Sequence, residues 1–276
     1  MVTGKPELHP EHQAFVDRFV AACKLDTDIV AAFLGGSYAR GTADRYSDID
    51  LYVIVSDEAF DDFNANCDEF LRLLGEPLFI ENFDIPNIVF FIYADGVEGE
   101  LGIGRESKYT DIHAGPHIIL VDKENILAGV EFAPAEPDPL EQAEQLRRLI
   151  YWFWHDLSHF VTAMQRGQLW WAQGQLEALR RYCVNLLRMG HNFTDLEAGE
   201  EPYFKIDQTV PIGQLAVLEE TFCPREKDAM LKSGVILVEV YKELATSLAR
   251  AHDIPYPEVL ERIMVPRLED LQEFTS

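Results

Sequence analysis

The segment from Leu34 to Val53 constrains the fold more than any other part of the chain, because it joins two apolar runs through a loop of defined spacing. It reads LGGSYARGTADRYSDIDLYV. Its skeleton is a Gly-Ser pair, a glycine four residues after the serine, and Ser-Asp-x-Asp leading into an apolar run. The apolar runs, at 28–34 and 48–55, have the length of buried strands. The segment therefore predicts two strands of one sheet joined by a loop that binds a ligand.

The first half of this loop has the composition of a phosphate-binding turn. Gly35 and Gly36 allow the backbone to turn sharply and to approach a ligand closely. Ser37 is expected at the start of a short helix, where free N–H groups face an anion and the hydroxyl adds a further donor. We therefore expect Gly36 and Ser37 to hold a triphosphate. The loop is not a P-loop, because no Gly-Lys-Ser/Thr follows it.

Asp48 and Asp50 are two residues apart on the second strand, so both side chains point to the same face. Adjacent carboxylates repel each other unless a cation lies between them, and Mg²⁺ prefers oxygen ligands and also binds phosphates. Two such ions can activate an attacking hydroxyl and stabilise the phosphate under displacement. A neighbouring strand at 97–103 offers Glu100 as third metal ligand or general base. Glu98, on the same face, is the second choice.

Three further residues are candidates for contact with the triphosphate. Arg40 in the loop could touch the triphosphate or be a solvated arginine. Ser47 could hydrogen-bond a phosphate or cap the turn before Asp48. Lys205, in the second half of the chain, could neutralise phosphate charge, although most surface lysines do no such thing.

Periodicity divides the chain into two halves. Amphipathic helices are predicted at 10–24 and 57–74, and further strands at 78–82, 88–93, 97–103 and 117–121. Prolines at 134, 137 and 139 mark a linker over 131–139. Helical stripes dominate the chain beyond this linker, with helices expected near 212–222, 225–251 and 257–272. We expect an α+β protein: a small mixed-sheet catalytic domain over 1–130, then an all-α bundle over 138–276 that binds the substrate.

Composition limits the partners. The net charge is −25, from 23 basic and 48 acidic residues, and such a surface repels nucleic acid and anionic membranes but suits a cationic acceptor. Acidity that serves only solubility is the alternative. No apolar run approaches the roughly 20 residues of a membrane span, and the N-terminus has no apolar signal core, so we expect a cytoplasmic protein. The first three of the four cysteines fall on apolar stripes and are expected to be buried free thiols.

A stripe on the first bundle helix combines Arg148, Trp152, His155 and His159 at helical spacing. It could line an acceptor pocket, with Trp152 stacking on a ring, but we favour packing within the bundle. The pair Trp170-Trp171 is expected to pack in the core.

At Gly36, Ser37, Asp48 and Asp50 the chain resembles the DNA polymerase β-like nucleotidyltransferase superfamily. Its layout, a small catalytic domain followed by helices, is similar to that of the aminoglycoside nucleotidyltransferases. The stretch YADGVEGEL from Tyr93 to Leu101 resembles the hairpin of the 6-adenylyltransferase branch that supplies the third carboxylate, with Glu100 where that branch generally has Asp. The resemblance implies transfer of a nucleoside monophosphate, often AMP from ATP, to a hydroxyl with the help of magnesium.

Two rival functions fit the same motif. One is an antitoxin-type transferase that adenylylates a partner protein. The other is a non-catalytic nucleotide-binding regulator, against which the intact set of Ser37, Asp48 and Asp50 argues.

Overall fold

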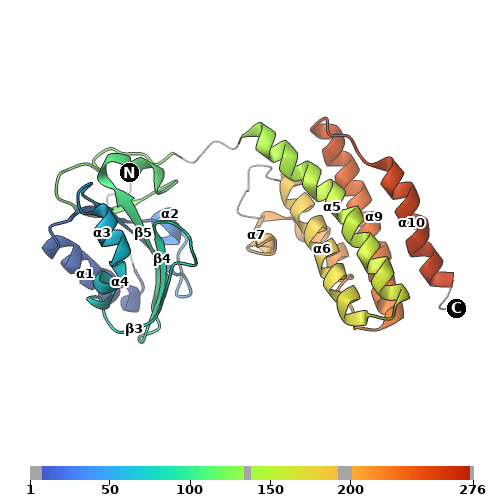
Figure 1. Cartoon of the computed structure of the whole chain (residues 1–276), viewed down its shortest axis with the longest axis horizontal. Helices are drawn as coiled ribbons and strands as arrows, with labels where there is room; N and C mark the ends of the chain where they lie inside the picture. Colours follow the sequence, from blue (N-terminus) through green and yellow to red (C-terminus); the bar gives the residue numbers. More distant parts are fainter. Residues whose placement is uncertain (1–7, 134–137, 192–200, 274–276) are drawn as a thin grey trace. The chain divides into compact units, whose positions relative to one another are not determined.

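The chain divides into two compact units, Met1–Ala135 and Glu136–Ser276. The computed structural model describes residues 8–133, 138–191 and 201–273, and Figure 1 draws both units with their elements labelled. Residues 134–137 of the predicted linker lie outside the described residues, so the predicted domain boundary there stays a prediction.

The first unit is built on a six-stranded sheet in the order β3-β4-β5-β2-β1-β6. The strands are β1 (Ile29–Leu34), β2 (Ile49–Val55), β3 (Pro77–Glu81), β4 (Ile88–Tyr93), β5 (Glu98–Arg105) and β6 (Ile118–Asp122). Strands β2 and β5 run parallel, and each other neighbouring pair is antiparallel. The sheet is therefore mixed, as the sequence predicted.

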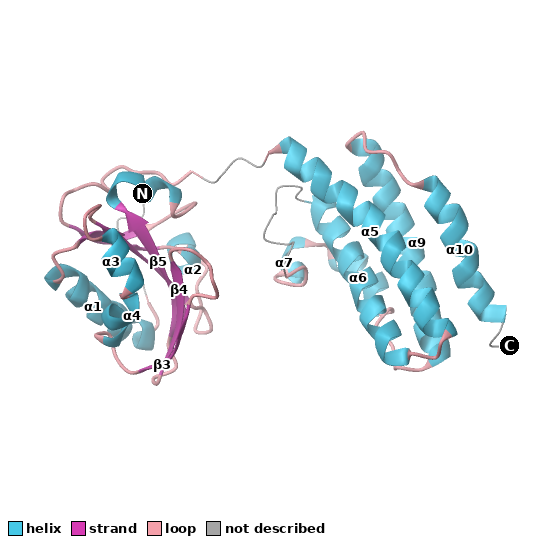
Figure 2. Ribbon diagram, in the orientation of Figure 1, coloured by secondary structure: helices cyan, strands magenta, loops and turns pink. Residues whose placement is uncertain are grey.

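Helices α1 (Pro10–Leu25), α3 (Phe60–Ala65) and α4 (Cys67–Arg72) lie on one side of this sheet (Figure 2). Alternate residues of β2, such as Leu51 and Val53, point into the core beneath them with Phe15 and Phe19 of α1. Burial of these side chains stabilises the layer through removal of apolar surface from water.

The single helix predicted over 57–74 is wrong in detail, because the chain forms two short helices separated at Asn66. The Asn66 side-chain amide donates to the Asp62 carbonyl at 2.9 Å. A side chain that occupies a backbone acceptor in this way competes with continuation of the helix.

The other face of the sheet carries a smaller apolar cluster. Phe33, Tyr52 and Ile54 pack there against Phe132, and the Phe33 and Tyr52 rings stack with centroids 4.6 Å apart. The short helix α2 (Gly36–Arg40) follows β1, and a 3₁₀ segment, Glu106–Asp111, follows β5.

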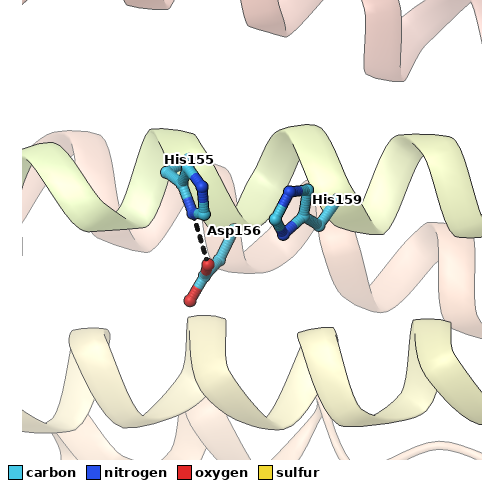
Figure 3. Close-up of side chains that lie close together, drawn as sticks. All are labelled: His155, Asp156 and His159. Carbon is cyan, nitrogen blue, oxygen red and sulfur yellow. Dashed lines mark hydrogen bonds and ion pairs between the residues drawn. The ribbon is translucent and has the colours of Figure 1, made fainter.

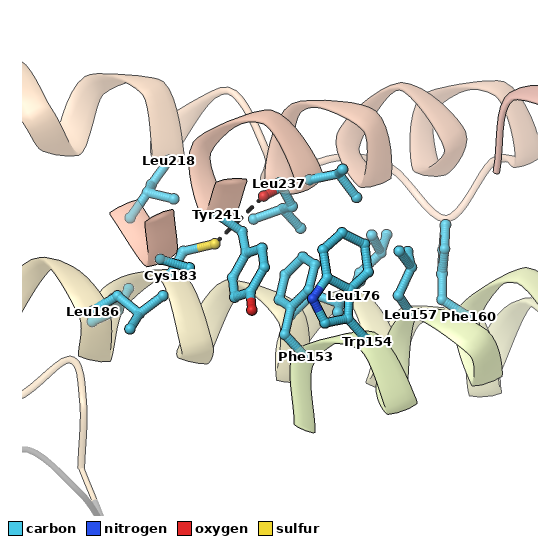
Figure 4. Packing of buried hydrophobic residues seen from close by; sticks show 14 of the residues in the cluster. Phe153, Trp154, Leu157, Phe160, Leu176, Cys183, Leu186, Leu218, Leu237 and Tyr241 are labelled. Carbon is cyan, nitrogen blue, oxygen red and sulfur yellow. Dashed lines mark hydrogen bonds between the residues drawn. The ribbon is translucent and has the colours of Figure 1, made fainter. Parts of the chain in front are cut away.

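The second unit is entirely helical in the residues that the structure describes. Its long helices are α5 (Pro139–Gln165), α6 (Leu169–His191), α9 (Lys227–Ala251) and α10 (Glu258–Glu273), with short helices α7 (Ile206–Thr209) and α8 (Ile212–Glu219). Figure 4 shows the core between them. Phe153 of α5 stacks on Tyr241 of α9 with ring centroids 3.5 Å apart, and the Tyr241 hydroxyl donates to the Ile150 carbonyl. The predicted α+β class with an all-α second part is confirmed.

Two expectations for this unit are wrong. Trp170 and Trp171 lie in the first turn of α6, where Trp170 is 76% exposed and Trp171 is 36% exposed, so the pair does not pack in the core. The Arg225 guanidinium covers the Trp170 ring at 3.8 Å instead. Trp152 is also half exposed, at 51%, so the α5 stripe does not pack within the bundle at this position.

Cys23, Cys67 and Cys183 are buried free thiols, as predicted. None of the described helices combines the length and the apolar character needed to cross a bilayer.

Candidate active site

Asp50 and Glu100 are direct neighbours across the two parallel strands. The register of β2 and β5 pairs Asp50 with Glu100, Leu51 with Leu101 and Tyr52 with Gly102. Paired residues of adjacent strands project to the same face. The side chains of Asp50 and Glu100 are both half-buried on the face opposite α1, and Asp48 is exposed immediately before β2. Glu98 is exposed at the start of β5 and pairs with Ile92 on the other side.

The three carboxyl groups act on one another electrostatically. Burial, followed by the charges of Asp50 and Asp48, raises the pKa of Glu100 to about 7. Burial and the charge of Asp48 likewise raise the pKa of Asp50 to about 6, although Arg40 and the Ser37 backbone N–H oppose this shift. Ionisation of both Asp50 and Glu100 is therefore unfavourable near neutral pH unless a cation binds between them.

The motif glycine makes room for one of these carboxylates. Gly36 has φ +55°, and a Cβ built on it would lie 1.5 Å from Oδ2 of Asp50. Ser37 follows in the first turn of α2, and its Oγ is buried without a hydrogen-bond partner among the described residues. A buried hydroxyl that lacks a partner costs free energy, so this atom is available to a ligand oxygen. Both observations fit a site for phosphate next to the carboxylates.

The donor set also fits magnesium. Three carboxylates and a hydroxyl on the loop, Asp48, Asp50, Glu100 and Ser37, are the hard oxygen ligands that this ion prefers. Among the described residues, the carboxylate oxygens of Asp48, Asp50 and Glu100 are not all within 4.8 Å of one another. Such a separation is expected because like charges repel each other. Closure around an ion would need rotation of these side chains.

The other predicted nucleotide contacts differ in their surroundings. The Arg40 side chain is exposed, and its charge lowers the pKa of Asp50. Ser47 Oγ accepts from the Asp44 backbone N–H at 2.9 Å, which favours the turn-capping interpretation. Lys205 precedes α7 in the second unit, with its Nζ 4.6 Å from the Phe204 ring centroid. Roles for these three in nucleotide binding stay predictions.

Sequence reasoning missed two aromatic side chains beside the motif. A Cβ on Gly35 would meet the Tyr52 ring at 2.8 Å and the His113 ring at 2.9 Å. These rings lie 4.8 Å apart, and His113 Nε2 is 3.0 Å from the Pro116 carbonyl. The alternation of side chains along β2 could have predicted the position of Tyr52, because it is two residues after Asp50 and points to the same face. No local signal marks His113, which a loop brings to the sheet.

Helix α1 is tied to α2 by a buried polar pair that the sequence did not reveal. His12 Nδ1 is hydrogen-bonded to the Tyr38 hydroxyl. Burial lowers the pKa of His12, as does the neighbouring His9, whereas Glu11 and Asp48 raise it. The contact joins α2 to α1, and the His12 imidazole lies near enough to Asp48 for the two side chains to interact electrostatically.

Beyond Glu100 the sheet offers partly exposed phenylalanines. Phe90 is the partner of Glu100 on β4. Its ring lies 5.8 Å from that of Phe83, which lies 5.9 Å from that of Phe79. Phe83 is mostly exposed. An aromatic surface therefore continues from the carboxylates toward the edge of the sheet.

Comparison with known proteins finds a family, a short match to a relative and several solved structures, two of which are described below. The model of the family described as streptomycin adenylyltransferase matches residues 11–268. A putative protein adenylyltransferase of Methanocaldococcus jannaschii is 50% identical over 42 residues, which are 14% of this chain and only 29% of that relative. Among solved structures, an aminoglycoside 6-adenyltransferase from Bacillus subtilis aligns over 96% of this chain and 99% of its own, with 16% identity and a TM-score of 0.45. A nucleotidyltransferase-like protein from Exiguobacterium sibiricum aligns over 96% and 90%, with 11% identity and a TM-score of 0.35.

The mixed sheet, with the Gly-Ser loop beside the paired carboxylates, has the layout expected of a nucleotidyltransferase. The chain belongs to the streptomycin adenylyltransferase family. This assignment rests on the sequence match over nearly the whole chain.

Proposed function

We propose that the protein transfers AMP from ATP, with magnesium, to a hydroxyl of a small cationic acceptor such as an aminoglycoside. The observation that carries this proposal is the pairing of Asp50 with Glu100 across β2 and β5, directly beside Gly36 and Ser37. The raised pKa values of Asp50 and Glu100 support binding of a cation at this place. The unpartnered Ser37 hydroxyl beside them supports binding of an anion.

Asp48, Asp50 and Glu100 would hold two magnesium ions. The ions would supply charge neutralisation of the triphosphate and of the group under transfer. Ser37 and Arg40 would bind phosphate oxygens, and Lys205 remains a further candidate for this role. These contacts would orient the α-phosphate toward the acceptor.

The reaction is an in-line displacement. The acceptor hydroxyl oxygen forms a bond to the α-phosphorus of ATP as the bond from that phosphorus to the bridging oxygen breaks, and pyrophosphate leaves with the bond electrons. Glu100 would take the hydroxyl proton. Carboxylates positioned beside the reacting hydroxyl are among the groups that serve as general bases.

Two features favour a cationic acceptor that carries rings. The net charge of −25 attracts polycations at long range. The aromatic surface formed by Phe79, Phe83 and Phe90 begins at the strand partner of Glu100. Rings of the acceptor could pack on it while its ammonium groups face the acidic side chains.

Pyrophosphate release tests the proposal. The purified protein is incubated with ATP, Mg²⁺ and a panel of aminoglycosides, other amino-alcohols and neutral sugars. Turnover with a cationic alcohol, abolished by EDTA, is the expected result. Calorimetry of ATP binding provides the control, because ATP should bind weakly without the metal. Equal affinity for ATP with and without Mg²⁺ would contradict the proposal of a two-metal site.

Protein adenylylation is a second candidate, favoured by the local match to the putative protein adenylyltransferase. Incubation with ATP labelled at the α-phosphate separates the two. Label recovered on a polypeptide, with none on the small alcohols, would support this candidate and exclude an aminoglycoside-like acceptor.

A further inference from the structure

Three metal-binding side chains lie together on helix α5, in the unit that does not carry the motif. His155, Asp156 and His159 each offer a ligand atom, and these atoms all lie within 4.8 Å of one another. Figure 3 shows the two imidazoles and the carboxylate on neighbouring turns of the helix. In the part of the chain that the structure describes, this is the group that meets that spacing.

Helix geometry brings the two histidines together. Residues four apart lie one above the other on the same face of an α-helix, and the ring centroids of His155 and His159 are 4.3 Å apart. Asp156 directs its carboxylate back to the first imidazole, with Oδ1 at 2.9 Å from His155 Nδ1. The backbone of α5 thus holds two nitrogen donors and one oxygen donor without the help of a loop.

A neighbouring helix fixes the carboxylate. The Tyr182 hydroxyl on α6 donates to Asp156 Oδ2 at 2.8 Å. The Asp156 side chain is only 17% exposed, whereas His155 is half exposed. Carboxylates that bind metals commonly accept a hydrogen bond from a neighbouring side chain, and this bond limits the orientations of the carboxylate. The exposed side of His155 leaves room for water or another ligand on the ion.

We propose that His155, Asp156 and His159 bind a zinc ion. Two imidazoles and one carboxylate, with an open position, are a common set of zinc ligands. Late first-row divalent ions bind imidazole nitrogen strongly, whereas Mg²⁺ prefers oxygen. This cluster and the carboxylates of the candidate active site therefore select different ions. The proposal does not depend on the function proposed above.

Zinc binding to the full-length protein tests the inference. The protein is dialysed against Zn²⁺ in buffer with excess Mg²⁺, which occupies oxygen-ligand sites, and bound zinc is measured by elemental analysis. One equivalent per chain is expected for the wild type and none for His155→Gln/His159→Gln. The matched control is His191→Gln, on the same unit, where the ring contacts Gln214. That variant should keep its zinc.

Tyr182→Phe tests the support of the carboxylate. It removes only the hydroxyl that donates to Asp156, and the loss of such a partner typically weakens metal binding by about 10–100-fold. Circular dichroism confirms that each variant is folded. A competition titration against a chromogenic chelator measures the change in affinity.

Tryptophan fluorescence gives an independent readout that also serves if the double variant folds poorly. Trp152 lies 4.7 Å from the His155 ring, and Trp171 lies 5.7 Å from the His159 ring. Ni²⁺ bound at the cluster should quench their emission in the wild type, and Zn²⁺ should compete for this quenching. The absence of zinc above the level of a metal-free blank would overturn the inference. So would retention of bound zinc by the double variant.

Discussion

The carboxylate of Asp50 occupies the space that a side chain at position 36 would need. A Cβ built on Gly36 would lie 1.5 Å from Oδ2 and 2.2 Å from Cγ of Asp50. The Ser37 backbone N–H also donates to this carboxylate and lowers its pKa, against the larger effects of burial and Asp48. The start of α2 and strand β2 are therefore one packed arrangement, in which the residue at 36 decides where Asp50 can lie.

Gly36→Ala should abolish activity, because the added methyl must displace the Asp50 carboxylate. Gly41→Ala is the matched control. Both glycines have positive φ, at +55° and +71°, but a Cβ on Gly41 would have nothing within 4 Å. Each variant should lose about 1–3 kcal/mol of stability from backbone strain, and only Gly36→Ala should lose turnover in a pyrophosphate assay. Equal activities of the two variants would show that the contact with Asp50 is unimportant.

Asp50→Asn should abolish turnover and leave the fold intact. The amide keeps the shape of the carboxylate but removes the charge that we assign to metal binding. We expect kcat to fall by more than tenfold, a loss of over about 1.4 kcal/mol in transition-state stabilisation. Steady-state kinetics at saturating Mg²⁺ measures the change. A variant that keeps more than a tenth of the wild-type rate would rule out Asp50 as a primary ligand.

Glu100→Gln should lower kcat by about a hundredfold or more, as expected for loss of a general base, whereas Glu98→Gln should change it little. The register places Glu100 beside Asp50, and Glu98 is exposed at the strand start. Rates of the two variants are compared with the same acceptor. A large loss of kcat in Glu98→Gln, with little loss in Glu100→Gln, would show that Glu98 and not Glu100 is the third carboxylate.

The stability of the metal-free protein should fall between about pH 4 and pH 7 because of Glu100 and Asp50. Their folded pKa values, about 7 and about 6, lie above the ordinary 4.5 and 3.8. A raised folded pKa contributes stability that is complete below the ordinary pKa and is lost as the pH rises through the folded value.

Thermal melting in EDTA measures this effect. Glu100→Gln should melt higher than the wild type near pH 8, by about 2–4 °C for each kcal/mol of repulsion removed, and the difference should vanish near pH 4. Glu98→Gln removes the same charge from an exposed position and should follow the wild type. Added Mg²⁺ should raise the melting temperature of the wild type more than that of Glu100→Gln. A difference that persists unchanged at low pH would contradict the assigned shift.

Local sequence determined most of the secondary structure and the position of the motif. The strand predicted over 88–93 matches β4, and the bounds of β1, β2 and α1 lie within one residue of expectation. These elements are set by apolar periodicity, which depends on near neighbours in the chain. The departures lie where a single side chain changes the backbone, as Asn66 does between α3 and α4.

Other features depended on residues far apart in the chain. The pairing of Asp50 with Glu100 follows from the parallel register of β2 and β5, and a shift by one residue would have turned Glu100 to the other face. Trp170 and Trp171 are exposed because of their place in the folded bundle. A short stretch of sequence does not reveal that place.

The sequence by itself determined that the chain has a Gly-Ser loop, two aspartates two residues apart at the start of the second strand, and a helical second half, because each is a local pattern of residues. Only the tertiary structure decided that Asp50 fills the space beside Gly36, that Tyr52 and His113 flank the loop, and that Tyr182 holds Asp156. These relationships join residues from separate elements. They depend on how side chains pack between layers, and packing is a property of the whole fold.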